Sequence, residues 1–223
     1  MNHTPAEQQT LDLTALMASE FHELKNQLGH LTLTLGEVAS QHPDLTDALH
    51  EPRLICQRIA DRLVQALTLY KSDQDSLTLN IGAQSPSDFL QEIQVQARAL
   101  AGDKLDIVCS VEAAPPFWFF DRYLVEIALL NAVHNALQFA RGRIEIGASS
   151  DAGGLCFYVR DDSDGYPGHI LANQGHVPGK AASGTGLGLF FANRIAQAHE
   201  NKDRQGRMTL RNEDGAVFSL WLP

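Results

Sequence analysis

Ser183-Gly-Thr-Gly-Leu-Gly-Leu189 stands directly before a segment of helical composition that runs to His199. Glycine lets a backbone approach a ligand closely, and the first turn of a helix presents unpaired N–H groups at its positive dipole end. The stretch is therefore typical of a phosphate site, and a glycine-rich turn without a ligand is the alternative. It is not the dinucleotide fingerprint, because no strand, turn and helix with a downstream ribose-binding acid surround it.

Two further patterns in the second half of the chain favour a nucleotide. Val159-Arg-Asp-Asp-Ser-Asp-Gly-Tyr-Pro167 stands at the end of an expected strand, where a carboxylate can accept a hydrogen bond from an adenine amino group. An acidic surface turn is the alternative. Asn131 and Asn135 lie one turn apart on an expected helix and share a face. A carboxamide oxygen is a suitable Mg²⁺ ligand, and a hydrogen-bonded structural asparagine fits the pattern equally well.

Length and composition limit the number of domains and the classes of protein to which the chain can belong. The 223 residues allow one domain or two small ones, and 44% hydrophobic residues exclude wholesale disorder. The formal net charge of −10 argues against a nucleic-acid partner, because such binding needs a basic face that displaces counterions.

Compartment and membrane association can also be predicted. Cys56, Cys109 and Cys156 form no CxxC pair, so we expect reduced thiols rather than a disulfide framework or a thiolate zinc site. The N-terminus MNHTPAEQQT lacks the basic region and the apolar run of a signal peptide. No apolar run approaches the roughly 20 residues of a membrane span. The sequence favours a cytoplasmic chain without membrane insertion.

The first third of the chain predicts a helical hairpin. Between residues 10 and 39 apolar side chains recur in alternating steps of four and three, typical of a bundle or coiled-coil helix. The members of this seam are Met17, Phe21, Leu24, Leu28, Leu31, Leu35 and Val38. Pro43 ends this helix near His42, and a second helix is expected over about 51–71 with Pro52 in its first turn. Either the rest of the chain or a second copy must cover the seam, and we favour a homodimeric four-helix bundle.

The remaining chain mixes strands and helices. Strands are expected over 77–83, 105–111, 143–148, 155–160, 207–211 and 217–222, and helices over 87–101, 122–141 and 186–199. The helix over 87–101 has Ser87 or Asp88 near its start. The last two strands are joined by a hairpin at 212–215. The predicted fold class is α+β, with the helical hairpin followed by an α/β sandwich.

In this order and spacing the motifs resemble those of the histidine kinases of two-component signalling. NAVHNALQFA (131–140) is similar to their N box, VRDDSDGYP (159–167) to their first glycine box and GTGLGLFFANRIAQAH (184–199) to their second. FSLWLP (218–223) resembles the closing strand of their catalytic domain, and FHELKNQL (21–28) resembles their H box. The resemblance covers about 10–223. It implies a flexible N-terminus at 1–9, a dimerisation and histidine phosphotransfer hairpin at 10–71, a linker at 72–76 that acts as a hinge, and a catalytic ATP-binding domain at 77–223.

The H-box resemblance implies catalytic residues on the first helix. His22 lies one step past the seam residue Phe21, so its ring faces solvent, as a phosphoacceptor requires. Glu23 can orient this ring or accept its proton. The resemblance also implies that Glu23 and Asn26 position a water for dephosphorylating a response regulator.

The other boxes imply ATP and Mg²⁺ as cofactors. Asn135 is then the magnesium ligand, Asn131 supports the polyphosphate, Asp161 contacts adenine and Gly165 shapes the adjacent turn. The residues expected to line the triphosphate are Gly184, Thr185, Gly186, Leu187 and Gly188.

Several positions depart from the family pattern. Ser163 replaces a common glycine, Gln138 replaces a common basic residue, and His199-Glu-Asn replaces His-Gly-Gly. The expected ATP lid at 168–183 is short and lacks a phenylalanine pair. These departures predict ATP binding with slow turnover. The length leaves no room for a sensor, a membrane anchor or a receiver domain, so we expect a separate sensor protein to supply input, or a role within a relay.

The leading hypothesis is an ATP-dependent protein-histidine kinase that autophosphorylates on His22 and passes the phosphoryl group to a response regulator receiver domain. The alternative is a histidine phosphotransferase of a phosphorelay with a degenerate, non-catalytic ATP-like domain. An anti-sigma-type serine kinase is disfavoured, because it leaves the hairpin and its histidine without a purpose. Whether phosphorylation is within one protomer or across the dimer depends on the handedness of the hairpin loop.

Overall fold

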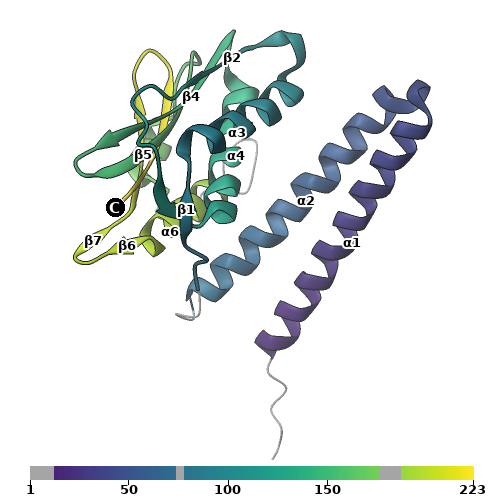
Figure 1. Cartoon of the computed structure of the whole chain (residues 1–223), viewed down its shortest axis with the longest axis horizontal. Helices are drawn as coiled ribbons and strands as arrows, with labels where there is room; N and C mark the ends of the chain where they lie inside the picture. Colours follow the sequence, from purple (N-terminus) through teal and green to yellow (C-terminus); the bar gives the residue numbers. More distant parts are fainter. Residues whose placement is uncertain (1–12, 74–77, 176–186) are drawn as a thin grey trace, which may run out of the picture. The chain divides into compact units, whose positions relative to one another are not determined.

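The computed structural model describes residues 13–73, 78–175 and 187–223 (Figure 1). The chain divides into two compact units, Met1–Tyr70 and Lys71–Pro223. The first unit is helical and the second is built around a mixed sheet, so the predicted α+β class is confirmed.

The N-terminal unit is a pair of long helices. Helix α1 (Leu13–Gln41) is followed by a short 3₁₀ turn, η1 (Pro43–Leu45), and by helix α2 (Thr46–Asp73). A Cβ built on Gly36 of α1 would lie 3.6 Å from the Arg53 guanidinium of α2, so the second helix returns along the first near the turn. Helix α2 includes residues 72 and 73 of the expected linker, and residues 74–76 lie outside the described residues, as do residues 1–9.

The start predicted for the second helix is wrong. Thr46 already has helical backbone angles, φ −54° and ψ −47°, so the 3₁₀ turn leads straight into α2 and Pro52 lies inside the helix instead of in its first turn. A proline in a helix interior costs about 3 kcal/mol, because its ring clashes with the preceding turn and one donor is lost.

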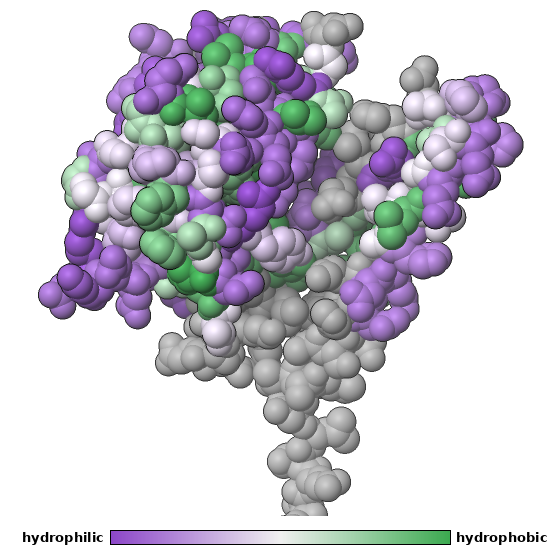
Figure 2. Space-filling model, in the orientation of Figure 1, coloured by the Kyte–Doolittle hydropathy of each residue, from purple (hydrophilic) through white to green (hydrophobic). Residues whose placement is uncertain are grey.

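Large apolar side chains remain exposed on these two helices. Leu33 is 70% exposed, and Leu24, Leu31, Ile55 and Ile59 are each exposed by about two fifths or more. Figure 2 shows apolar patches, most of them on the C-terminal unit, in a surface that is otherwise mainly hydrophilic. Among the residues that the structure describes, no helix combines the length and the apolar character needed to cross a membrane.

A five-stranded sheet forms the frame of the C-terminal unit. Its order is β2-β4-β5-β9-β8, with β2 parallel to β4 and the other neighbours antiparallel. Helices α3, α4 and α6 gather on one face of the sheet (Figure 1). The strands are β2 (Asp106–Ser110), β4 (Arg143–Asp151), β5 (Gly154–Asp161), β8 (Arg207–Asn212) and β9 (Ala216–Leu222), and the helices are α3 (Pro86–Ala101), α4 (Arg122–Phe139) and α6 (Leu187–Ala198).

Smaller elements complete this unit. Strand β1 (Gly82–Gln84) pairs with β3 (Trp118–Phe120), and β6 (Glu200–Asn201) pairs with β7 (Arg204–Gln205). A short helix, α5 (Gly168–Asn173), and a 3₁₀ turn, η2 (Gly102–Lys104), complete the described elements.

One expected strand in this unit is wrong, whereas the helix that follows it is near its expected position. The strand expected at 77–83 shrinks to β1, because the Asn80 N–H donates to the Asp121 carboxylate (2.8 Å) instead of to a neighbouring strand. Helix α3 begins one residue before the expected start and has Ser87 and Asp88 in its first turn, as expected; its cap is Ser85, whose hydroxyl accepts a hydrogen bond from the Asp88 N–H (3.3 Å). The expected hairpin at 212–215 is confirmed, since Asn212 pairs with Ala216 across the turn.

An aromatic cluster ties the helical layer to the sheet. Phe89 of α3, Phe120 of β3 and Phe157 of β5 are fully buried, and their ring centroids lie 5.3–5.5 Å apart in tilted and edge-to-face pairs. Burial of rings of this size contributes roughly 1.5–3 kcal/mol each, and the aromatic geometry adds to this. The cluster therefore anchors the segment that leads into α4.

A buried histidine fixes the start of α4. The Asp121 carboxylate caps this helix by accepting from the Leu124 N–H (3.0 Å), and the Asp121 N–H donates to Nε2 of His199 (3.0 Å). The His199 Nδ1–H donates to the Ile195 carbonyl (2.7 Å), so the ring is neutral and protonated at Nδ1. Burial lowers the pKa of His199, against smaller raising effects of the Ile195 carbonyl and of Asp121.

This arrangement predicts a loss of stability in mild acid. The unfolded imidazole takes up its proton near pH 6.5, before the buried ring does. The contribution of His199 to stability is therefore complete above pH 6.5 and is lost as the pH falls from there through the depressed pKa of the folded state. Because both tryptophans, Trp118 and Trp221, lie in the C-terminal unit, fluorescence-detected urea unfolding at pH 8 and at pH 5.5 reports on this unit.

The control is His199→Gln, whose carboxamide oxygen still offers the Asp121 N–H an acceptor but does not titrate. We expect the free energy of unfolding to fall less between the two pH values in this variant than in the wild type. Equal falls in the two proteins would contradict the assignment.

Candidate functional site

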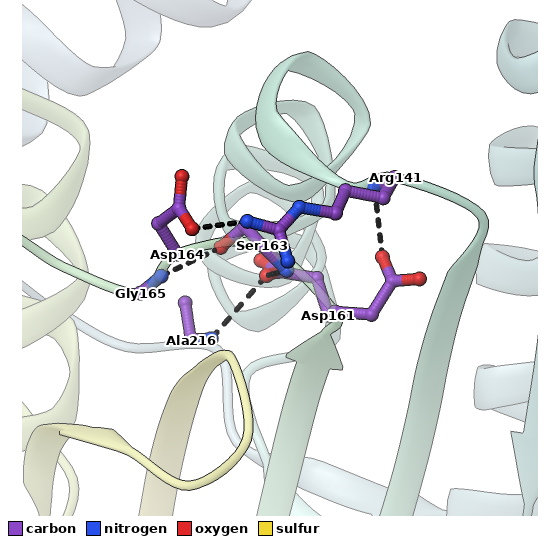
Figure 3. A network of polar contacts seen from close by, with 7 residues as sticks. Arg141, Asp161, Ser163, Asp164, Gly165 and Ala216 are labelled. Atoms are coloured by element: carbon purple, nitrogen blue, oxygen red, sulfur yellow. Dashed lines mark hydrogen bonds and ion pairs between the residues drawn. The ribbon is translucent and has the colours of Figure 1, made fainter.

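Asp161, the last residue of β5, is a buried carboxylate with one oxygen held by the backbone. Its Oδ1 accepts hydrogen bonds from the Ser163 N–H (2.9 Å) and from the Ala216 N–H at the start of β9 (3.3 Å). Figure 3 shows the contact with Ala216 across the end of the sheet. Within the described ranges Oδ2 receives no hydrogen bond. The side chain is thus a fixed acceptor with one free oxygen.

The loop after Asp161 is held in a single conformation. The Ser163 hydroxyl accepts a hydrogen bond from the Gly165 N–H (3.0 Å), and Asn212 both accepts from the Tyr166 N–H (2.8 Å) and donates to the Tyr166 carbonyl (3.1 Å). Gly165 has a φ of +85°, and a Cβ there would approach the Asn212 side chain to 2.5 Å. Only glycine fits this position.

Burial raises the pKa of Tyr166, and the nearby charge of Asp161 adds to the effect. Its phenol therefore stays protonated at neutral pH and can act as a hydrogen-bond donor.

Asp162 ties the same strand end to helix α4. Its Oδ1 accepts from the Arg141 N–H (2.7 Å) and the Gly142 N–H (3.2 Å), and its Oδ2 accepts from the Arg143 N–H (3.2 Å). The small degree of burial acts to raise the pKa of Asp162, but these three backbone donors and the N–H of Asp162 itself outweigh it, so the pKa is lowered. Arg141 also forms an ion pair with Asp164, which contributes little because both side chains are largely exposed.

Helix α4 carries the two asparagines beside α6. Asn131 and Asn135 are partly exposed and lie one turn apart. A Cβ built on Gly188 would lie 3.3 Å from Asn131 Cγ, which is tighter than ordinary contact, so the lack of a side chain at Gly188 lets α6 pass close to Asn131. Leu187 begins the described part of α6, and the expected residues Gly184, Thr185 and Gly186 lie outside the described residues.

The residues expected to carry phosphotransfer all belong to α1. Glu23 and Asn26 are exposed, and the Glu23 carboxylate accepts a hydrogen bond from the Gln27 side chain one turn away (3.1 Å). His22 is part of the same helix, but its side chain lies outside the described residues.

Sequence reasoning missed several residues that shape the site. Gly215 is one: a Cβ there would lie 1.9 Å from the Asp161 carbonyl oxygen, and its φ is +143°. Asn212, Asp162 and Ala216 are others, because their partners are 19 to 55 residues away in the sequence. The only signal for Asn212 and Gly215 was their place in a hairpin turn. The described residues thus offer a fixed carboxylate acceptor at the end of β5 and two amide side chains on α4.

The C-terminal part of the chain matches a known family, and most of the chain is similar to curated histidine kinases. Residues 121–223 match the histidine kinase-, DNA gyrase B-, and HSP90-like ATPases. The signal transduction histidine-protein kinase AtoS of Escherichia coli (strain K12) is 30% identical over 227 aligned residues, which cover 95% of this chain and 35% of AtoS. The sensor histidine kinase CpxA of the same organism is 26% identical over 224 residues, which cover 93% of this chain and 46% of CpxA. The chain thus spans between a third and a half of the length of these curated relatives.

Solved structures share the fold. The catalytic domain of the histidine kinase ThkA superposes with a TM-score of 0.57 at 19% identity, over 65% of this chain and 98% of that domain. Full-length ShkA in complex with AMPPNP superposes with a TM-score of 0.64 at 19% identity, over 93% of this chain and 45% of ShkA. The chain is thus similar over most of its length to curated histidine kinases, and residues 121–223 belong to the histidine kinase-, DNA gyrase B-, and HSP90-like ATPases.

Proposed function

We propose that this chain is an ATP-dependent protein-histidine kinase that autophosphorylates on His22 and transfers the phosphoryl group to an aspartate of a response regulator. The observation that carries the proposal is the Asp161 carboxylate, whose Oδ1 is occupied by two backbone N–H groups while its Oδ2 accepts nothing from the described residues. This free oxygen lies within the segment that matches the ATPase family. ShkA, which shares the fold, was solved in complex with AMPPNP, and this supports ATP as the ligand.

Adenine recognition follows from the charge and direction of Asp161. A carboxylate oxygen accepts but does not donate, so it selects a ligand edge that presents N–H, such as the adenine amino group. Because Oδ1 is already fixed, binding does not have to order this side chain, which favours affinity. Gly165 and Asn212 hold the turn that follows it.

The phosphate end of the nucleotide is assigned to α4 and α6. Asn135 offers a carboxamide oxygen to Mg²⁺, a hard cation that prefers oxygen ligands. When bound, Mg²⁺ would neutralise part of the negative charge of the β- and γ-phosphates. Gly188 passes close to Asn131, and this proximity supports a polyphosphate-binding role for both. Leu187 and the glycine-rich residues Gly184, Thr185 and Gly186 complete the proposed lining.

The phosphoryl acceptor is assigned to α1. The neutral imidazole of His22 attacks the γ-phosphorus, the bond to the bridging oxygen breaks and ADP leaves, while the ring proton passes to Glu23 or to solvent. The catalytic domain must approach the hairpin for this step, and residues 72–76 are the proposed hinge between residues 10–71 and 77–223. We assign a second activity, dephosphorylation of the response regulator, to a water held by Glu23 and Asn26.

The exposed leucines and isoleucines of α1 and α2 support a homodimer through a four-helix bundle. The proposed partners are a response regulator receiver domain and a second copy of the chain, the proposed site of action is the cytoplasm, and neither nucleic acid nor membrane insertion is part of the proposal.

Asp161→Asn tests nucleotide binding. The carboxamide oxygen of the variant can still accept hydrogen bonds from the Ser163 and Ala216 N–H groups. Its NH₂ group then faces the adenine amino group, and two donors cannot form a hydrogen bond. We expect the Kd for MgATP, measured by isothermal titration calorimetry on the intact chain, to rise at least about 10-fold, as befits the loss of a hydrogen bond to a charged group. The matched control is Asp164→Asn, whose side chain is 92% exposed, and its Kd should stay within about twofold of the wild type. Wild-type affinity in both variants would refute the assignment of Asp161.

His22→Gln tests the phosphoacceptor. After incubation with γ-labelled ATP and Mg²⁺, the wild-type chain should carry acid-labile label and His22→Gln should carry none, because a carboxamide cannot accept the phosphoryl group. The control is His30→Gln, which changes an exposed histidine two turns further along α1 and should label normally.

Label that persists in His22→Gln would contradict the role of this residue. A wild-type chain that takes up neither nucleotide nor label would favour the histidine phosphotransferase with a degenerate ATP-like domain.

A further inference from the structure

Ser163 makes two hydrogen bonds that link three residues of the loop after β5. Its backbone N–H donates to Asp161 Oδ1 (2.9 Å), and its hydroxyl accepts from the Gly165 N–H (3.0 Å). Figure 3 shows Ser163 between these two partners. Beyond Gly165, Asn212 binds both the N–H and the carbonyl of Tyr166. The backbone is thus held at residues 163, 165 and 166 by side chains.

The hydroxyl of Ser163 makes the central hydrogen bond of this loop, the one to Gly165. Without it, the part-buried Gly165 N–H would lose its acceptor, at a cost typical of a lost hydrogen bond. Because glycine has no side chain, its backbone angles are little restricted. The φ of +85° at Gly165 therefore depends on such contacts. A shift of Ser163 would in turn displace the N–H that holds the Asp161 carboxylate. The orientation of the free Asp161 oxygen therefore depends on a side chain two residues away.

We propose that Ser163 is a positioning residue for adenine recognition: its hydroxyl orders the loop so that Asp161 Oδ2 is aimed at the adenine amino group before the nucleotide arrives. The inference rests on the proposed function, since it concerns the same site. A glycine at this position would leave the loop to be ordered on binding, whereas the serine has it ordered in the free protein, and preorganisation of this kind raises affinity.

The test compares two ligands, MgATP and the Mg²⁺ complex of N6,N6-dimethyl-ATP, which lacks the amino N–H groups. Their Kd values are measured by calorimetry on the intact wild type, Ser163→Ala and Ser163→Thr. In Ser163→Ala we expect the Kd for MgATP to rise about fivefold, while the Kd for the dimethyl analogue changes by less than twofold. Threonine keeps the hydroxyl, so Ser163→Thr should restore the wild-type preference for ATP over the analogue.

Ser85→Ala is the matched control. The Ser85 hydroxyl also accepts a hydrogen bond from a backbone N–H, that of Asp88 (3.3 Å), but at the start of α3. This variant should lower the free energy of unfolding and leave the ratio of the two Kd values unchanged.

The outcomes separate the inference from the proposed function. If the wild type binds and prefers ATP, but Ser163→Ala weakens both ligands equally or neither, the role of Ser163 is overturned and the nucleotide site stands. If the preference is lost in Ser163→Ala and is not restored by threonine, the hydroxyl is not its source, and the inference is likewise overturned. If the wild type binds neither ligand, the proposed function itself fails, and the inference with it.

Discussion

The hydrogen bonds received by Asp161 Oδ1 join three parts of the C-terminal unit at one atom. The Ser163 N–H belongs to the loop after β5, and the Ala216 N–H belongs to the first residue of β9. The two strands can meet this closely only because Gly215 has no side chain: a Cβ there would overlap the Asp161 carbonyl oxygen at 1.9 Å. The hairpin turn is therefore part of the candidate site, and a substitution in the turn would displace the Asp161 carboxylate directly.

Helix α4, which carries the two asparagines, is held at both ends by aspartates outside the helix. Asp121 caps its first turn and is itself bonded to the buried His199, so the start of α4 is joined to the end of α6. Asp162 accepts three N–H groups from the segment that follows the helix, so its end is joined to the end of β5. Asn131 and Asn135 are thereby placed between two fixed points, relative to both the Asp161 loop and α6. This rigidity is what a site needs in order to position a ligand for group transfer.

Much of the fold could be predicted because its elements have clear periodicity. The four strands over 143–161 and 207–222 and the long helices are near their expected positions, since alternation and heptad spacing are local properties. Pro52 misled the prediction, because proline is common in first turns, but here a 3₁₀ turn had already started the helix. The two-residue strands β6 and β7 are too short to show a period at all.

For the candidate site, too, features within a short segment could be predicted from the sequence and contacts between distant segments could not. Asp161 and Gly165 could be identified because they lie in one short motif. The contributions of Asn212 and Ala216 depend on contacts across 46 and 55 residues, which a motif cannot contain. Ser163 was recognised only as a departure from a pattern, and its hydrogen bonds give that departure a structural reason.

The central claim is that Asp161 is the fixed acceptor of a bound adenine, and the most direct measurement is a crystal structure of this chain with AMPPNP and Mg²⁺. We predict an adenine amino nitrogen within hydrogen-bond distance of Asp161 Oδ2, about 2.7–3.2 Å, with both backbone N–H groups still on Oδ1. A nucleotide bound elsewhere, or an adenine whose amino group makes no contact with Asp161, would contradict the account.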